Sequence, residues 1–166
     1  MRNKKLIAAI GLLATSIVIF FAWPLSFTRV YHGIEDGSFM VIWVTDITID
    51  DNRPLHDTVG FQFYTDSTEF ESIMKILRDY SYRRTFRGLT TTRYQRHFTQ
   101  LEGNSAGFWL NMRVHNADVT TNSDIHSGGT NEILIDGIIY RMRSSQNIAM
   151  MNEIRDFLTE NVLPIP

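Results

Sequence analysis

An apolar run near the N-terminus constrains the fold of this chain more than any other feature. Residues 6–25 are apolar except for Gly11, Thr15, Ser16 and Pro24. A helix needs about 20 such residues to cross the hydrocarbon core of a bilayer. Burial of this run inside a soluble core is not expected. We therefore predict a transmembrane anchor over residues 6–25.

Basic residues in front of the apolar run predict its orientation. Arg2, Lys4 and Lys5 lie within the five residues before it. Short flanks rich in lysine and arginine stay in the cytoplasm. We expect residues 1–5 to form a cytoplasmic basic tail and the chain after Leu25 to lie outside the cytoplasm. The aromatic residues expected at the outer interface are Phe20, Phe21, Trp23, Phe27 and Tyr31.

A cleaved signal peptide is the competing interpretation of this segment. Cleavage requires small residues one and three positions before the cut, and Ala14 with Ser16 is the only suitable pair. A cut there would leave the apolar residues 17–23 at the new N-terminus. The pattern favours an uncleaved signal-anchor in a cell membrane.

After the anchor the chain has room for one compact domain. Pro24 marks a boundary, and residues 26–37 contain Gly33 and Gly37, so we expect a short linker there. Twelve extended residues reach at most about 40 Å. The extracytoplasmic domain, residues 38–166, is thus expected to work close to the membrane.

The absence of cysteine narrows the chemistry. It excludes disulfides, thiolate metal sites, cysteine nucleophiles and acylation of an N-terminal cysteine. No Asn-x-Ser/Thr acceptor occurs either, so nothing indicates glycosylation. These absences favour a bacterial cell envelope.

Periodicity predicts an α+β fold. Residues 39–49 form a β-branched and aromatic run, and residues 50–54 are turn-prone. Asp66 with Glu69 forms a capping pattern that opens a helix, and Asp136 with Gly137 predicts a type I′ hairpin turn. Further strands are expected over 58–64, 82–86, 92–101, 107–115, 132–135 and 138–142, and a last helix over 145–160. We predict an antiparallel sheet of about five to six strands with two helices packed on one face.

The expected inward faces are set by the same periodicity. In residues 107–115 they comprise Phe108, Leu110, Met112 and Val114. Both faces of residues 39–49 are expected to be largely covered, as in a central strand, with Met40, Ile42 and Val44 on one face and Val41, Trp43 and Thr45 on the other. In the helices they comprise Phe70, Ile73, Met74, Leu77, Tyr80, Ile148, Met151, Ile154, Phe157 and Leu158.

Arginine crowding is the most unusual local feature. One stretch with a single acidic residue, Asp79, contains Arg78, Arg83, Arg84, Arg87, Arg93 and Arg96. From Ser26 onward the chain carries 13 Lys/Arg against 18 Asp/Glu, a formal charge of −5, so the stretch stands against an acidic background. Arginine suits planar bidentate contact with phosphate or carboxylate.

Two interpretations of these arginines stay open. In the first, Arg83, Arg84, Arg87, Arg93 and Arg96 bind anionic headgroups, an anionic wall polymer or an acidic partner surface. In the second, they lie on a solvated strand pair and form internal ion pairs.

Motifs for chemistry are missing. Asp46, Asp50, Asp51 and Asn52 lack the spacing of an EF-hand loop, and the histidines have no zinc-site spacing. Residues 127–130 read as a flexible loop without the features of a phosphate loop. Ser127, His126 and Asp124 are adjacent in sequence, which is not the geometry of a catalytic triad. We expect no catalytic residues, metal or cofactor, and no nucleic-acid partner.

The chain also resembles a group of known domains. It shares with small single-span exported domains of unknown function from Gram-positive bacteria a basic start, one anchor helix, the helix start "DSTEF" and the closing "NEILIDGIIYRM" hairpin. The resemblance implies an envelope location and a fold type, and it brings no activity.

These observations predict a membrane-anchored extracytoplasmic binding module. Its expected partner is a neighbouring membrane protein or an anionic envelope polymer or lipid. The alternative is a cell-envelope hydrolase that uses carboxylates or a serine in a cleft of the sheet.

Overall fold

The computed structural model describes residues 2–31, 39–50, 53–86, 107–115, 122–128 and 131–165. Its class is α+β, with one apolar N-terminal helix and an antiparallel sheet, as the sequence predicts. The strand predicted over 92–101 lies outside the described residues.

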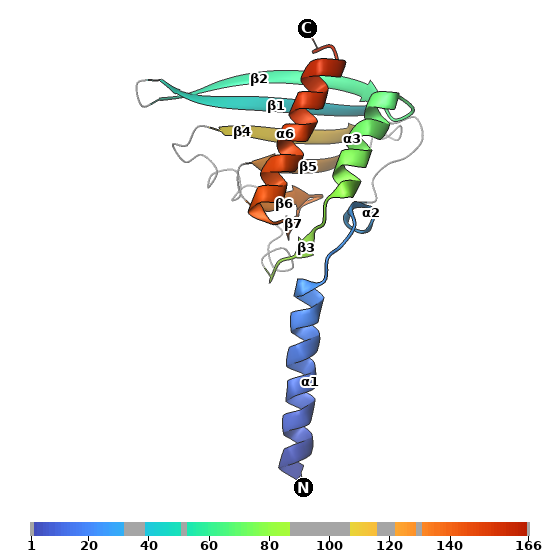
Figure 1. The fold of residues 1–166 in the computed structure, drawn as a ribbon, viewed down its shortest axis with the longest axis vertical. Coiled ribbons are helices and arrows are strands. Elements are labelled where there is room, and N and C mark those ends of the chain that lie inside the picture. The colour runs from blue at the N-terminus through green and yellow to red at the C-terminus, as the bar shows by residue number, and fades with distance from the viewer. Residues whose placement is uncertain are drawn as a thin grey trace.

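Helix α1, Arg2–Ala22, projects from the remaining elements and approaches them at its C-terminal end (Figure 1). Its segment Lys4–Ala22 is long and apolar enough to cross a membrane, and none of it is buried within the protein. The helix ends at Ala22, three residues before the predicted limit of the anchor. Pro24 has no amide hydrogen to continue the ladder, and Leu25 is only 4% exposed in the domain.

The predicted linker is packed into the domain over its first part. Helix α2, Phe27–Val30, follows directly, and Phe27, Val30 and Tyr31 are buried. The Phe27 ring lies 5.2 Å from that of Tyr31 and 5.8 Å from that of Tyr82. Burial of these aromatic rings outweighs the flexibility expected of a connector. Phe27 and Tyr31 are therefore core residues, and the prediction that they lie at a membrane interface is wrong.

Among the described residues, seven antiparallel strands form the sheet, one more than the upper limit of the prediction. The additional strand β5 is polar, so its sequence does not predict a strand. It forms because it pairs with β4 over seven residues. The spatial order is β2-β1-β4-β5-β6-β7-β3. The strands are β1 Phe39–Asp50, β2 Arg53–Tyr64, β3 Arg83–Arg84, β4 Gly107–His115, β5 Asn122–Gly128, β6 Glu132–Ile135 and β7 Ile138–Arg141.

Strand limits differ from the prediction at two turns. β2 begins at Arg53, because Asp50 pairs with Arg53 and the hairpin continues beyond the predicted strand start. Ser127 and Gly128, expected in a loop, end β5 opposite β4. Both differences arise from pairing between strands, which local composition does not report.

Helices α3, Thr68–Asp79, and α6, Ser144–Asn161, cover the same face of the sheet (Figure 1). The N-cap of α3 is Ser67, whose hydroxyl accepts a hydrogen bond of 3.1 Å from the amide of Phe70. The predicted capping pattern thus lies one residue too early. A serine at this position satisfies one of the amides left free at a helix start.

Between the helices and the sheet lies one apolar core. The inward strand residues whose side chains are described are buried as predicted, as are Phe70, Ile73, Met74 and Leu77. In α6 the prediction is wrong for Ile148, which is 44% exposed, and Met150 is buried instead. Met151, Ile154 and Leu158 are buried as predicted, Phe157 is partly buried against the core, and Asn147 completes the buried face with Met150.

The β6–β7 turn has the predicted type I′ character. Asp136 and Gly137 both adopt positive φ, 48° and 78°. An added Cβ at Gly137 would meet nothing within 4 Å, so space does not require glycine there. The backbone conformation does.

Replacing this glycine tests the turn. Gly137→Ala should lower the free energy of unfolding by about 1–2 kcal/mol, because a left-handed conformation is costly for a residue with a Cβ. Chemical denaturation of the full-length protein in detergent micelles measures the change. Asp136→Asn is the control and should cost less, since asparagine tolerates positive φ. Equal stability of Gly137→Ala and the parent would contradict the assignment.

Candidate functional site

Strand β3 brings two of the predicted arginines to the sheet edge beside α1. Arg83 pairs with Arg141 of β7, and Arg84 pairs with Tyr140. Arg83 is exposed and Arg84 is partly exposed. Arg141 forms an ion pair of 3.6 Å with Glu132. Three guanidinium groups thus belong to neighbouring positions of one sheet edge.

The end of α1 contacts this edge directly. The guanidinium carbon of Arg84 lies 4.4 Å from the centre of the Phe20 ring. The rings of Phe21 and Phe86 are 6.4 Å apart. Cation–π contacts of this kind contribute about 0.5–1 kcal/mol at exposed sites. Arg84 is therefore positioned by the helix as well as by its own strand.

Backbone pairing fixes the same junction. Leu25 donates an amide hydrogen bond of 2.7 Å to the carbonyl of Tyr82, and Tyr82 returns one of 3.0 Å to Leu25. The Tyr82 hydroxyl donates to the carbonyl of Leu77 at 2.8 Å, and burial raises the pKa of Tyr82. Residue 82 is fully buried, so the segment that enters β3 begins from a fixed point.

A hollow of about 680 Å³ opens between the end of α1 and the β3–β7 edge. Its walls carry three arginines, one carboxylate and two aromatic rings, of which Phe21 belongs to α1 and Phe86 follows β3. Burial raises the pKa of Tyr140, and the nearby Arg84 guanidinium acts in the opposite direction. The lining residues are Phe21, Arg83, Arg84, Thr85, Phe86, Glu132 and Arg141.

This arrangement suits an anion with several oxygens. A guanidinium donates two parallel hydrogen bonds to phosphate or carboxylate. Arg83 and Arg141 lie directly opposite each other on the neighbouring strands β3 and β7. Arg141 also forms an ion pair with Glu132. The hollow therefore offers more positive charge than its own carboxylate neutralises.

Of the predicted arginines, the structure brings together Arg83 and Arg84. Arg87, Arg93 and Arg96 lie outside the described residues. Arg78 lies on α3 and pairs with Glu71 at 3.6 Å, so it belongs to another surface. Sequence reasoning missed Arg141. Only the register of β3 against β7 relates it to the cluster, and no local pattern carries that register.

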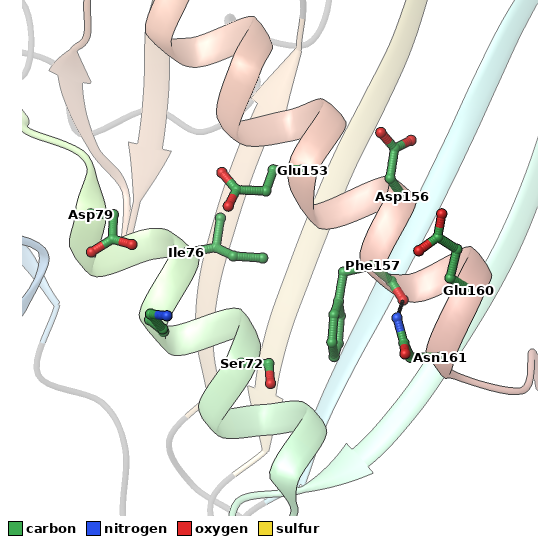
Figure 2. Close-up of a pocket in the computed structure, with 9 residues that line it drawn as sticks. Ser72, Ile76, Asp79, Glu153, Asp156, Phe157, Glu160 and Asn161 are labelled. Carbon is green, nitrogen blue, oxygen red and sulfur yellow. Dashed lines mark hydrogen bonds between the residues drawn. The ribbon is translucent and has the colours of Figure 1, made fainter.

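A second hollow lies between α3 and α6 and has the opposite charge (Figure 2). Its volume is about 440 Å³. Ile76 and Phe157 provide its apolar part, and Lys75 is its one basic lining residue. The acidic lining residues are Asp79, Glu153, Asp156 and Glu160.

Tyr80 links the two helices at this acidic hollow. Its hydroxyl donates a hydrogen bond of 3.0 Å to Glu153. Burial and this bonded carboxylate raise the pKa of Tyr80 to about 12. Among the described residues no group of three or more His, Asp or Glu side chains could hold a metal ion.

Ser127 occupies a core position beneath α6. Its hydroxyl donates a hydrogen bond of 2.8 Å to Oδ1 of Asn147, and the sulfur of Met151 lies 3.2 Å from it. Both Ser127 and Asn147 are buried. Asp124 and His126 belong to the same strand, and their side chains are outside the described part of the structure. The described bonds of Ser127 join α6 to the sheet.

The candidate calcium residues are divided. Asp46 forms an ion pair of 3.9 Å with Arg155 of α6. Asp50 ends β1, and Asp51 and Asn52 lie outside the described residues. Asp46 is thus involved in helix–sheet packing.

Comparison with protein-family models, with curated proteins and with solved structures finds no match to this chain.

Alkaline pH tests the environment of Tyr80. The folded pKa of about 12 lies above the unfolded value of about 10. The group's stabilising contribution is present below pH 10 and is lost as pH rises towards 12. Thermal unfolding of the full-length protein should show falling stability over this interval, with a smaller fall in Tyr80→Phe. Glu153→Gln should give an intermediate result, and an identical fall in all three proteins would refute the assignment.

The contact between Arg84 and Phe20 predicts a fixed junction between α1 and the domain. The chain has no cysteine, so spin labels attach only where cysteines are introduced. Labels at Ile17 and Ile138, both exposed, should give one narrow distance distribution by pulsed electron paramagnetic resonance. Arg84→Gln should broaden it, and Arg78→Gln should not. A broad distribution without any substitution would show that the junction is not fixed.

Proposed function

We propose that this chain is a membrane-anchored extracytoplasmic binding module whose arginines bind a phosphate-bearing component of the envelope. Helix α1 is the anchor in this proposal, and its N-terminus lies in the cytoplasm. The binding residues are Arg83, Arg84 and Arg141. Arg87, Arg93 and Arg96 follow β3 in sequence and are proposed to extend the same basic surface.

The length of α1 supports this placement. Its apolar segment Lys4–Ala22 has 19 residues, which span about 28 Å at the rise of an α-helix. That length is close to the thickness of a hydrocarbon core, about 30 Å. With Lys4 and Lys5 on the cytoplasmic side, Phe20 and Phe21 reach the outer interface, where aromatic side chains accumulate.

The contact of Arg84 with Phe20 carries the proposal. A side chain 4.4 Å from a ring at the outer interface lies at the level of the lipid headgroups. Arg83 and Arg141 are adjacent to Arg84 in the paired strands β3 and β7. Each arginine or lysine near an anionic membrane surface contributes about 1 kcal/mol to membrane binding. The arginines are therefore at the height where phosphate groups are most concentrated.

Two sources could supply the phosphate, a lipid headgroup and an anionic wall polymer. Both present the oxygen geometry that guanidinium groups bind. The test has one arm for each source. Full-length protein in zwitterionic detergent micelles is titrated with short-chain phosphatidylglycerol in one arm and with soluble poly(glycerol phosphate) in the other.

Charge reversal at the cluster should weaken binding. Arg83→Glu/Arg84→Glu should lower the affinity for the phosphate probe at least about tenfold, because two favourable contacts become repulsive. Lys75→Glu/Arg78→Glu makes the same change of charge on α3 and should have little effect. Microscale thermophoresis at several salt concentrations measures both. Saturable binding of phosphatidylglycerol alone would identify the lipid as the source. Saturable binding of the polymer alone would identify the wall polymer.

Equal weakening in both double variants would mean that the protein responds to net charge without a site. Absence of salt-sensitive binding to either probe by the unsubstituted protein would refute the proposal. In that case the arginines would be a solvated surface with internal ion pairs.

A further inference from the structure

Strand β2 is a long edge of the sheet, and the described residues leave its outer side almost uncovered. It pairs with β1 along its whole length, from Asp50↔Arg53 to Phe39↔Tyr64. Apart from the turn that follows β2, one hydrogen bond from the described part of the chain reaches this outer side. The amide of Ile165 donates it to the carbonyl of Gly60 over 2.8 Å. Edge strands of this length are templates for pairing with another chain.

The position of that hydrogen bond shows which residues face outward. In an antiparallel strand the backbone groups alternate between the two sides. Because the carbonyl of Gly60 points outward, the amide and carbonyl groups of Thr58 and Gln62 point outward too. Pro54 falls in the same set, where its missing amide costs no hydrogen bond to β1. An incoming strand would find donors and acceptors at every second residue.

The C-terminal tail is a weak occupant of this edge. Pro164 and Pro166 flank Ile165 and have no amide hydrogen. The tail therefore presents a single donor between them. Leu163 is 90% exposed, so it adds little packing. The side chain of Ile165 lies over Gly60, 3.3 Å from the place where a Cβ would be.

Three carboxylates lie on or near β2 on the helix side of the sheet. Asp46 and Asp57 lie directly opposite each other on β1 and β2, and both are exposed. Asp156 of α6 shares Arg155 with Asp46, at 3.6 Å and 3.9 Å. Arg155 is the basic residue that the described part of the structure places here, and it forms ion pairs with two of these carboxylates.

We infer that the outer edge of β2 binds an extended, basic segment of a partner protein, which displaces the C-terminal tail and adds a strand to the sheet. The backbone of the partner would pair with Thr58, Gly60 and Gln62. Its lysine or arginine side chains would meet Asp57, Asp46 and Asp156. Strand addition of this kind obtains affinity from main-chain hydrogen bonds and specificity from alternate side chains.

The place of β2 in the fold argues against a second copy as the occupant. β2 is the strand farthest from α1, at the opposite edge of the sheet from β3 (Figure 1). Pairing of two β2 edges would put the two α1 helices at opposite ends of one continuous sheet. If α1 is the membrane anchor, as the proposed function holds, both copies could not sit in the same membrane. The remainder of the inference is independent of the proposed function.

Two synthetic peptides of equal length test the inference, one alternating lysine with valine and one alternating glutamate with valine. Fluorescence anisotropy measures their binding to full-length protein in zwitterionic nanodiscs. The lysine peptide should bind, and the glutamate peptide should bind at least about tenfold more weakly. Removal of residues 163–166 should strengthen binding of the lysine peptide several-fold, because its competitor is gone.

Proline at an outward position separates strand addition from attraction of charge. Gln62→Pro removes an outward amide and should weaken binding of the lysine peptide at least about tenfold, whereas Gln62→Ala keeps the amide and should bind like the parent. Circular dichroism and the unfolding midpoint establish that both variants are folded. If Gln62→Pro is unfolded, a lysine peptide N-methylated at alternate residues replaces it and should fail to bind the parent.

Three results would overturn the inference. Equal binding to Gln62→Pro and Gln62→Ala, or equal binding of the methylated peptide, would indicate charge attraction only. Absence of binding even after removal of the tail would show that the edge is closed. Self-association of the protein that is lost in Gln62→Pro would assign the edge to a second copy. None of these results bears on the phosphate site, which lies at the opposite edge of the sheet.

Discussion

The junction between α1 and the domain depends on the buried position of Tyr82. Its backbone pairs in both directions with Leu25, its hydroxyl bonds to the carbonyl of Leu77, and its ring packs against Phe27. These contacts fix both the segment after α1 and the segment that leads from α3 into β3. The residues after α1 cannot swing freely, and β3 begins from a fixed place. The positions of Arg83 and Arg84 relative to α1 follow from this arrangement.

Much of the fold could be predicted from sequence because local periodicity and burial agree. A few neighbouring residues are enough to predict three kinds of element. These are the alternating strands β1 and β4, the apolar face of α3 and the Asp136–Gly137 turn. The errors occur where tertiary contacts decide. β5 contains one buried aliphatic residue, Ile125, and is a strand because β4 and β6 pair with it. At the start of α6, Ile148 was predicted to be inward, whereas the polar Asn147 is buried there and accepts a hydrogen bond from Ser127.

The candidate site shows the same limit. Local composition indicated the arginine-rich stretch, and the structure puts Arg83 and Arg84 beside the end of α1. Arg141 joins them through the register of β3 against β7, which requires the whole sheet. The outer edge of β2 was not apparent either, because the strand order that leaves it at an edge is a property of the fold.

The sheet also determines distance. Its strands run across the direction of α1 and are stacked away from it (Figure 1). With neighbouring strands about 4.8 Å apart, six intervals put β2 roughly 29 Å from β3. The number of strands thus acts as a spacer whose length does not depend on a flexible linker. A related chain with one additional hairpin in the sheet would present its outer edge about 10 Å farther from α1, with the junction at α1 unchanged.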